Sequence, residues 1–499
     1  MVSSLSKAAS YLAIAAPAAM FVCGIAVPSA QASDLRGECC ADLEERVAEL
    51  EATTARKGNR KMGVTITGQV HKMVMWWDDG RSSKTYYGVE NRNTSTRFSI
   101  LGKAKLTPNV KMGFEIMLDN QAASSAVMNQ WDANGKSSGL ITPLAALSFA
   151  GNNEDNYFGA ARHMIFWVED AKLGRVSVGH YEMAGAVRTL DLGDISAGAN
   201  LSLVIVNGGF LLRGPAGQYY ATKWLSFVDP SANRGRQNEL LYDSPAIMGF
   251  IFSSSIAGDG SNRGTMLRYA NEFSGVRVAA GIGYEHYGEV TARADCLVIS
   301  GVCANPPGYG PANLDAPAPN VNSWGAGVSV LHIPSGLFAQ GHYLRIDFDE
   351  DSPTTPAPFL GQLGPGRIPA DQWLIQGGIT KNWFGFGNTA FFAEYGHNSG
   401  WGAGGGPLTP NGISYSNLTT PGAQAVNGVI NSEVAMYGFG VTQHVDAAAT
   451  ELYLDARHFS ADITCSAANN CSGRAGSAPG TKLQTENFWA VIGGARVTF

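Results

Sequence analysis

The chain has 499 residues, of which 45% are hydrophobic, 15% are charged and 61 are glycine, and its formal net charge is −6. This composition excludes an intrinsically disordered chain, which would have few aromatic residues and a high net charge, and the acidic balance excludes a basic face for nucleic acid. The mean hydropathy of −0.05 would suit a soluble enzyme, and the length alone would allow two to four domains.

Residues 1–32 have the pattern of a secretory signal peptide. Lys7 supplies a positive start, residues 11–27 are almost wholly apolar or small, and Ala30-Gln31-Ala32 has the A-x-A form of a signal-peptidase site. A transmembrane anchor is the alternative, but the apolar run is short and Pro17 interrupts it. We therefore expect the mature chain to begin near Ser33.

Residues 33–60 are predicted to form a periplasmic N-terminal segment with a short amphipathic helix. Leu43, Val47 and Leu50 recur at helical spacing, with glutamates elsewhere around the helix. A helix of two heptads is marginal alone, so a surface helix and a trimeric coiled-coil stub both remain open. The vicinal Cys39 and Cys40 have no assigned partner.

From residue 61 to residue 499 the dominant signal is alternation of apolar and polar residues with period two. In 110–119, for example, Val110, Met112 and Phe114 alternate with Lys111 and Glu115. Such alternation over about ten residues predicts β-strands with one apolar and one polar face. The predicted strands are 64–77, 95–107, 110–119, 160–170, 175–183, 238–243, 249–257, 265–273, 276–287, 321–333, 337–348, 371–384, 388–398, 432–445, 449–461 and 486–499.

The gaps between these strands alternate in length. Short connections such as 107–109, 274–275 and 334–336 are followed by long, Gly- and Pro-rich ones. The long gaps are 79–94, 120–159, 184–237, 288–320, 349–370, 399–431 and 462–485. Short turns at one rim and long loops at the other are typical of a transmembrane barrel in an outer membrane.

The predicted fold class is therefore all-β, a transmembrane antiparallel β-barrel of about sixteen strands, with residues 61–499 as one domain. The sheet must close because backbone polar groups in hydrocarbon need partners. A secreted β-sandwich or propeller would show regularly spaced turns or a blade-length repeat, and neither is present. Tryptophans near strand ends are expected in the aromatic girdles: Trp76, Trp77, Trp167, Trp373, Trp383 and Trp489.

The gap at 184–237 is too long for an ordinary connection. It contains the apolar runs Leu201–Val206 and Phe210–Leu212, which an exposed outer loop would leave in water. We expect it to fold inward and narrow the lumen, with a flap at a subunit contact as the alternative.

Charged residues in and around this loop are the candidate pore constriction. Acids of the loop would face cations chosen from the strands by alternation, and the resulting field would order water and favour dipolar solutes. Each wall charge taken singly can equally be a solvated lumen residue. The acids are Asp191, Asp194 and Asp229, and the cations are Arg97, Lys103, Lys105, Arg268, Arg277, Arg345, Arg457 and Arg496.

Two cysteine pairs lie in or beside long gaps, Cys296 with Cys303 and Cys465 with Cys471. Stretches rich in Gly, Asn, Ala and Pro in an oxidising compartment favour loop disulfides. Zinc is the alternative, but no C-x-x-C spacing or nearby His pair supports it.

Motifs for catalysis are weak. Gly135–Gly139 fits G-x-S-x-G around Ser137, but it lacks the strand-turn-helix context of a nucleophile elbow. Gly151–Asn156 is acidic but lacks the spacing of a calcium loop. We predict no enzyme activity, cofactor or metal site. An outer-membrane hydrolase that uses Ser137 is the rival from another functional class.

Several segments resemble the alphaproteobacterial porin family: Glu38–Glu51, Arg60-Lys61, Val64–Val70, Met75–Gly80 and the terminal Phe499. The resemblance implies a sixteen-stranded, trimeric general porin of a Gram-negative outer membrane, with a third loop folded into the lumen. It also implies that Phe499 is an outer-membrane assembly signal.

The predicted function is passive diffusion of small hydrophilic solutes and ions, with membrane lipid and a homotrimer as partners and no nucleic acid. The alternative is a sugar-selective channel. In that case Tyr219, Tyr220 and Trp224 of the long loop would form an aromatic slide for the sugar.

Overall fold

The computed structural model describes residues 62–133, 158, 160–185, 190–198, 206–217, 219–224, 236–258, 260–287, 298–299, 302–303, 321–348, 369–400, 423–424, 429–465 and 481–499. The chain divides into two units, Met1–Lys61 and Met62–Phe499, and every described residue belongs to the second. The predicted signal peptide, the N-terminal helix and the Cys39/Cys40 pair lie outside the described residues. In the described ranges, no helix is long and apolar enough to cross a membrane.

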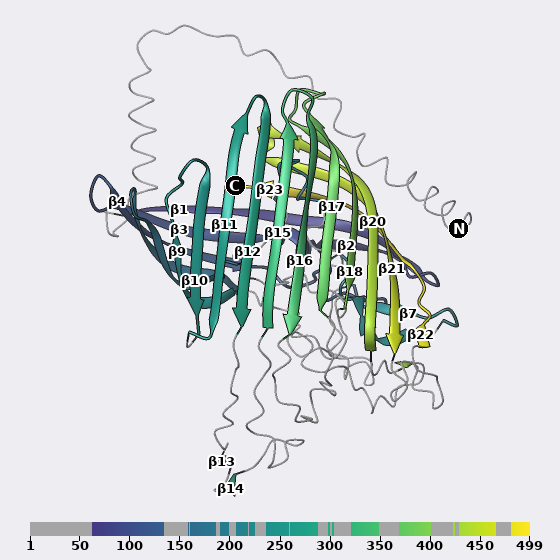
Figure 1. The fold of residues 1–499 in the computed structure, drawn as a ribbon. Coiled ribbons are helices and arrows are strands. Elements are labelled where there is room, and N and C mark those ends of the chain that lie inside the picture. Colours follow the sequence, from purple (N-terminus) through teal and green to yellow (C-terminus); the bar gives the residue numbers. More distant parts are fainter. Residues whose placement is uncertain are drawn as a thin grey trace. The chain divides into compact units, whose positions relative to one another are not determined.

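Sixteen antiparallel strands form the wall of a barrel (Figure 1). In order around the wall they are β1 (Gly63–Asp78), β3 (Arg97–Lys105), β4 (Val110–Asp119), β5 (Ala160–Asp170), β6 (Gly174–Glu182), β9 (Arg236–Asp243), β10 (Phe250–Ala257), β11 (Asn262–Phe273), β12 (Val276–Tyr287), β15 (Val321–His332), β16 (Leu337–Phe348), β17 (Ala370–Lys381), β18 (Thr389–Ser399), β20 (Val429–Val445), β21 (Thr450–Cys465) and β23 (Phe488–Thr498).

The barrel closes because β1 pairs with both β3 and β23. Its N-terminal part, Gly63–Gln69, pairs in register with β3, and its C-terminal part, Gln69–Asp78, pairs in register with β23. Every wall strand therefore has two hydrogen-bonded neighbours, so the wall has no open edge. All sixteen strands predicted from alternation are confirmed, and 110–119, 160–170, 276–287 and 337–348 have the predicted bounds.

The predicted long gap at 79–94 is wrong in part, because it contains a further strand. Strand β2 (Ser83–Glu90) pairs with the C-terminal part of β1, from Lys72 to Asp78. The 3-10 turn η2 (Arg92–Thr94) then separates β2 from β3. The second strand of the wall is thus interrupted near its middle.

The remaining elements are short. Strands β7 (Leu211–Arg213), β8 (Tyr219–Lys223) and β19 (Ala423–Gln424) form a small separate sheet, and β13 (Val298–Ile299) pairs with β14 (Val302–Cys303). Strand β22 (Thr481–Leu483) pairs antiparallel with the end of β21, and η5 (Asp446–Ala448) turns the chain between β20 and β21.

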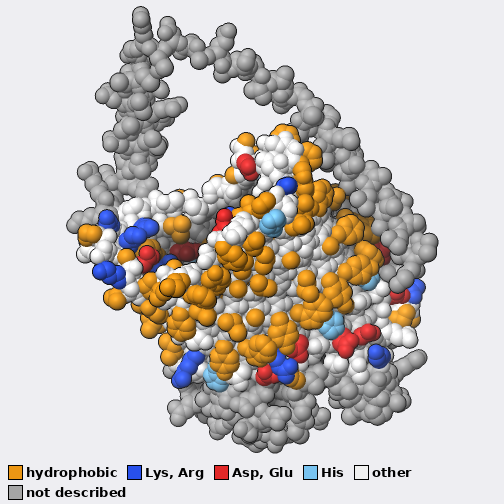
Figure 2. Space-filling model, turned by 45° about the horizontal axis from the view of Figure 1, so that its top comes forward, with side chains coloured by type: hydrophobic (Ala, Val, Ile, Leu, Met, Phe, Trp, Pro, Cys, Tyr) orange, Lys and Arg blue, Asp and Glu red, His pale blue; other side chains and the backbone are white. Residues whose placement is uncertain are grey.

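Alternation separates an apolar outer face from a buried inner face. In β12, Ile282 is exposed, whereas Glu285 and Tyr287 are buried. Hydrophobic side chains spread across the outer wall in the view of Figure 2. Exposed members of this belt include Val74, Leu267, Ile282, Val328, Ile375, Phe391, Phe439 and Leu452.

Aromatic side chains on the outer face cluster near strand ends. Ring centroids lie 5.2 Å apart for Trp324 and Tyr343 and 5.3 Å apart for Trp373 and Tyr395. Trp489 packs edge-to-face on His458. The girdle prediction is wrong for Trp77 and Trp167, which are buried on the inner face.

Candidate functional site: a segment held inside the barrel

Residues 190–198, which follow β6, lie against the inner wall. Their backbone and side chains form hydrogen bonds with inward-facing side chains of five strands. These bonds join Leu192 N to Ser329 Oγ (3.2 Å), Gly193 N to Gln340 Oε1 (3.4 Å), Asp194 O to His444 Nε2 (3.0 Å), Ser196 Oγ to Arg496 Nη2 (3.3 Å) and Gly198 O to Arg457 Nη2 (2.6 Å).

Asp191 shapes this segment from within. Its carboxylate accepts hydrogen bonds from the backbone N–H groups of Ile195, at 3.0 Å, and Ser196, at 2.8 Å. Gln340 Nε2 donates to the other carboxylate oxygen at 3.2 Å. Because its carboxylate accepts these three hydrogen bonds, Asp191 stabilises the turn of the segment and joins it to β16.

A row of polar side chains on the inner wall continues from Gln340. Gln340 Nε2 donates to Gln376 Oε1 at 3.0 Å, and Gln376 Nε2 donates to Glu394 Oε2 at 2.9 Å. Arg457 Nε then donates to Glu394 Oε1. The Arg457 and Glu394 side chains are 1% and 0% exposed, so this is a fully buried ion pair joined to segment 190–198.

Glycine makes this ion pair possible. In the sheet register Gly438 of β20 lies between Glu394 of β18 and Arg457 of β21. A Cβ atom at Gly438 would lie 2.9 Å from Arg457 Cγ and 3.0 Å from Glu394 Oε1. The missing side chain therefore lets the two charges meet across the intervening strand.

Replacing Gly438 by alanine is expected to destabilise the barrel by about 1–3 kcal/mol, the usual effect of overpacking. Gly281→Ala is the matched control, because a Cβ at that inward position in β12 would have no neighbour closer than 3.9 Å. Urea unfolding followed by tryptophan fluorescence measures both. Equal stability of the two variants would contradict the role of Gly438.

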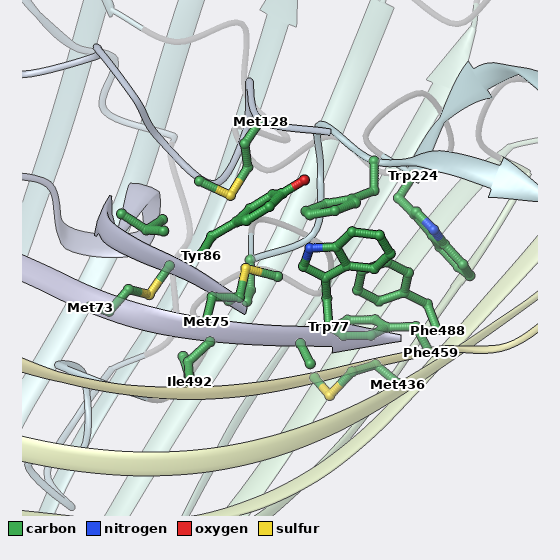
Figure 3. Close-up of a cluster of buried hydrophobic side chains, with 14 of the residues drawn as sticks. Met73, Met75, Trp77, Tyr86, Met128, Trp224, Met436, Phe459, Phe488 and Ile492 are labelled. Atoms are coloured by element: carbon green, nitrogen blue, oxygen red, sulfur yellow. The ribbon is translucent and has the colours of Figure 1, made fainter. Parts of the chain in front are cut away.

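An apolar cluster holds a second part of the same long segment. Phe210 and Leu212 are 0% exposed and belong to one cluster with Trp224 and with residues of the wall strands. Figure 3 shows Trp224 of this cluster near Trp77 and Phe488. Phe210 lies 5.2 Å from the Trp77 ring of β1 and 5.0 Å from the Phe488 ring of β23. Of the apolar residues that motivated the prediction of an inward loop, Val206 and Phe210–Leu212 are buried, and residues 201–205 lie outside the described residues.

Asp194 of this segment belongs to a small charged group. Its Oδ2 is 3.3 Å from His444 Nε2, and Arg496 Nη2 forms an ion pair with Glu451. Burial raises the pKa of Asp194 above its ordinary value, and the neighbouring His444 opposes the rise. One oxygen or nitrogen each of Asp194, His444 and Glu451 lies within 4.8 Å of the others, so these three could ligate a cation, although Arg496 already neutralises Glu451.

Alternating charges link the ends of four neighbouring wall strands. The ion pairs run from Arg92 to Asp119 (3.4 Å), Asp119 to Arg162 (3.3 Å), Arg162 to Glu182 (3.7 Å) and Glu182 to Arg236 (2.8 Å). Two carboxylates, Asp119 and Glu182, thus form ion pairs with three arginines. Arg97 lies opposite Asp119 in the sheet register.

The predicted constriction residues divide into two groups. Arg457 and Arg496 donate hydrogen bonds to segment 190–198, which contains Asp191 and Asp194, and Arg97 lies opposite Asp119 in the sheet register. Lys103 and Lys105 lie at the other end of β3, and they are exposed. Arg268 pairs with Asp243 at 2.6 Å, and Arg277 pairs with Glu272 beside the turn at 274–275. Asp229 lies outside the described residues.

Arg345 does not belong to the inner wall. Its neighbours Leu344 and Ile346 are buried on the inner face, so alternation turns Arg345 outward with Tyr343. It forms ion pairs with Asp347, at 2.9 Å, and Asp371, at 3.6 Å. The prediction is wrong here because a charge near a strand end can reach the polar membrane interface from the outer face.

The structure places some of the other predicted residues. Trp224 is 1% exposed inside the apolar cluster, so it does not face a passing solute. The other two residues of the predicted sugar slide, Tyr219 and Tyr220, have side chains outside the described residues. Ser137 of the alternative hydrolase also lies outside them, as do Cys296 and Cys471 of the two predicted disulfides. Phe499 pairs through its backbone with Gly68 at 2.9 and 3.0 Å.

Alternation missed Arg162, Arg236 and Glu394. Arg162 has no partner in β4 because the register shifts between Met117 and Leu118. Arg236 lies just before the predicted strand 238–243. Glu394 lies in the predicted strand 388–398 and shares the inner face with the buried Phe392, but only cations were selected from the strands.

The closed sheet, its apolar outer belt and its aromatic clusters define a transmembrane β-barrel of the Gram-negative outer-membrane type. Sequence comparison finds no matching family model and no matching curated protein.

Three of the solved structures that are similar to this chain come from bacteria. The anion-selective porin from Comamonas acidovorans is 13% identical, covering 88% of this chain and all of that one, with a TM-score of 0.48. Pseudomonas putida OprB is 10% identical, covering 95% of this chain and all of that one, with a TM-score of 0.45. The outer membrane channel DcaP of Acinetobacter baumannii is 10% identical, covering 89% and 99% of the two chains, with a TM-score of 0.42.

Proposed function

We propose that the chain is a porin, an outer-membrane channel through which small hydrophilic solutes and ions diffuse passively. The observation that carries this proposal is that segment 190–198 is held inside a closed barrel by hydrogen bonds to side chains of five wall strands. A segment fixed in this way narrows the lumen, and charged groups beside it act on whatever passes. The proposed role needs no bond chemistry and no cofactor.

The region beside segment 190–198 supports an aqueous path. It carries Asp119, Glu182 and several arginines close together, and such a density of charge needs water. We propose that these groups and Asp194 form the neck of the pore, with the apolar cluster around Phe210 filling another part of the interior.

Purified protein in a planar lipid bilayer is expected to give stepwise ion currents. Steps that group in threes would support a homotrimer, which we also propose. A protein whose resistance to urea shows that it is folded, but which conducts no ions, would contradict the porin function. A matched sample unfolded before addition to the bilayer serves as the control for leakage through the lipid.

A further inference from the structure

The arginines beside segment 190–198 outnumber the acids that pair with them. Arg92, Arg162 and Arg236 share Asp119 and Glu182, whereas Arg496 has Glu451. Arg97 adds a further positive charge. Among the described residues, this ionic group therefore has five arginines and three carboxylates, whereas Asp191 and Asp194, which belong to the segment itself, contact its backbone, Gln340 and His444.

Within this group, Arg97 is the arginine whose guanidinium can donate hydrogen bonds to a solute. Its guanidinium has no hydrogen bond or ion pair with any described residue, because Ser95, Arg92 and Arg162 occupy the carboxylate of Asp119 opposite it in β4. The charges that act on Arg97 are those of Asp119 and Glu182 and of two further arginines, Arg496 and Arg236.

Arg496 approaches the same place from the other side of β1. In the sheet register Gln69 lies opposite Arg97 in β3, and His71 lies opposite Arg496 in β23. Two strand spacings across the sheet and two residues along β1 separate the two arginine backbones, about 12 Å in all, which their long side chains can span. The Nε atom of Arg496 is buried and has no hydrogen-bond partner among the described residues.

Guanidinium groups with free N–H donors bind planar or tetrahedral oxyanions through paired hydrogen bonds. We infer that Arg97, supported by Arg496, is an oxyanion-binding site beside segment 190–198, and that the channel favours small anionic solutes that carry a carboxylate or phosphate group. This inference rests on the proposed porin function and names its solute class.

The test uses the full-length protein in a planar bilayer with chloride as the carrier and inorganic phosphate as the probe. We expect phosphate to reduce the chloride current, and we expect the half-blocking concentration to rise at least fivefold in Arg97→Gln. Arg97→Lys keeps the charge and should recover much of the block. Arg277→Gln removes one positive charge from a distant, paired position and should leave the block unchanged.

The outcomes separate the two proposals. A channel that conducts but is blocked equally by phosphate in Arg97→Gln and wild type contradicts the oxyanion site alone. The same holds if Arg277→Gln and Arg97→Gln weaken the block equally, since net charge would then explain the effect. Folded protein without any conductance contradicts the porin, and the oxyanion site with it.

Discussion

Replacing Arg457 by glutamine is expected to destabilise the folded barrel by about 3–5 kcal/mol, the usual effect of removing one partner from a buried ion pair. The variant would leave Glu394 and Asp455 buried without their cation, which lies 3.8 Å from Asp455 in the wild type. It would also remove the hydrogen bond to Gly198 O. Urea unfolding in detergent or lipid vesicles measures the loss.

Two further variants make this result interpretable. Arg277→Gln breaks a half-exposed pair with Glu272, so it should change stability by less than about 1 kcal/mol. The triple variant Arg457→Met, Glu394→Gln and Asp455→Asn removes all three buried ionisable groups and should recover at least half of the lost stability. If the Arg457→Gln barrel is as stable as the wild type, the ion pair does not contribute to the stability of the folded barrel.

The second large effect is expected from Phe210→Ala. Truncating a buried phenylalanine costs about 3–5 kcal/mol. Because Phe210 contacts Trp77 and Phe488 of the wall, this cost should weaken the binding of residues 206–217 to the inner wall. The wall strands themselves keep all their side chains. The variant should therefore retain the barrel but expose the chain at Arg213 to trypsin, with faster cleavage there than in the wild type.

Leu173→Ala is the control for this experiment, because that side chain is 72% exposed in a short turn and packs against little. Mass spectrometry of the fragments locates the cleavage after Arg213. Equal cleavage rates in Phe210→Ala and wild type would mean that other contacts, such as the two hydrogen bonds between Gln130 and Leu211, hold the segment without the aromatic cluster.

The wall of the barrel could be predicted from the sequence because a membrane and a wet lumen impose opposite demands on successive residues. In β12 that demand leaves Ile282 outside and Glu285 inside. Strand β2 escaped prediction because Ser83–Glu90 has no apolar alternation and pairs mainly through its backbone with β1. Its inward residues Tyr86 and Val89 fall out of period because Gly88, at φ +70°, intervenes.

The candidate site was harder to predict because alternation separates two faces without identifying the partners on them. Arg457 was selected as a lumen charge, but Glu394, its partner, is distant in sequence and becomes a neighbour only because Gly438 lies between them. Arg162 follows a register shift that reverses its apparent face. Trp77 was placed in a girdle, yet its face of β1 meets Phe210 from the long loop.

Segment 190–198 also has a mechanical consequence. It is bonded to Ser329 in β15 and to Arg496 in β23, and its Ser196 carbonyl accepts a hydrogen bond from Asn93, which follows β2. In the order of the wall, β15 is seven strands from β1, almost diametrically opposite in a ring of sixteen. The segment therefore ties together opposite sides of the ring as a cross-brace, which would resist flattening of the cylinder under the lateral pressure of the surrounding lipid.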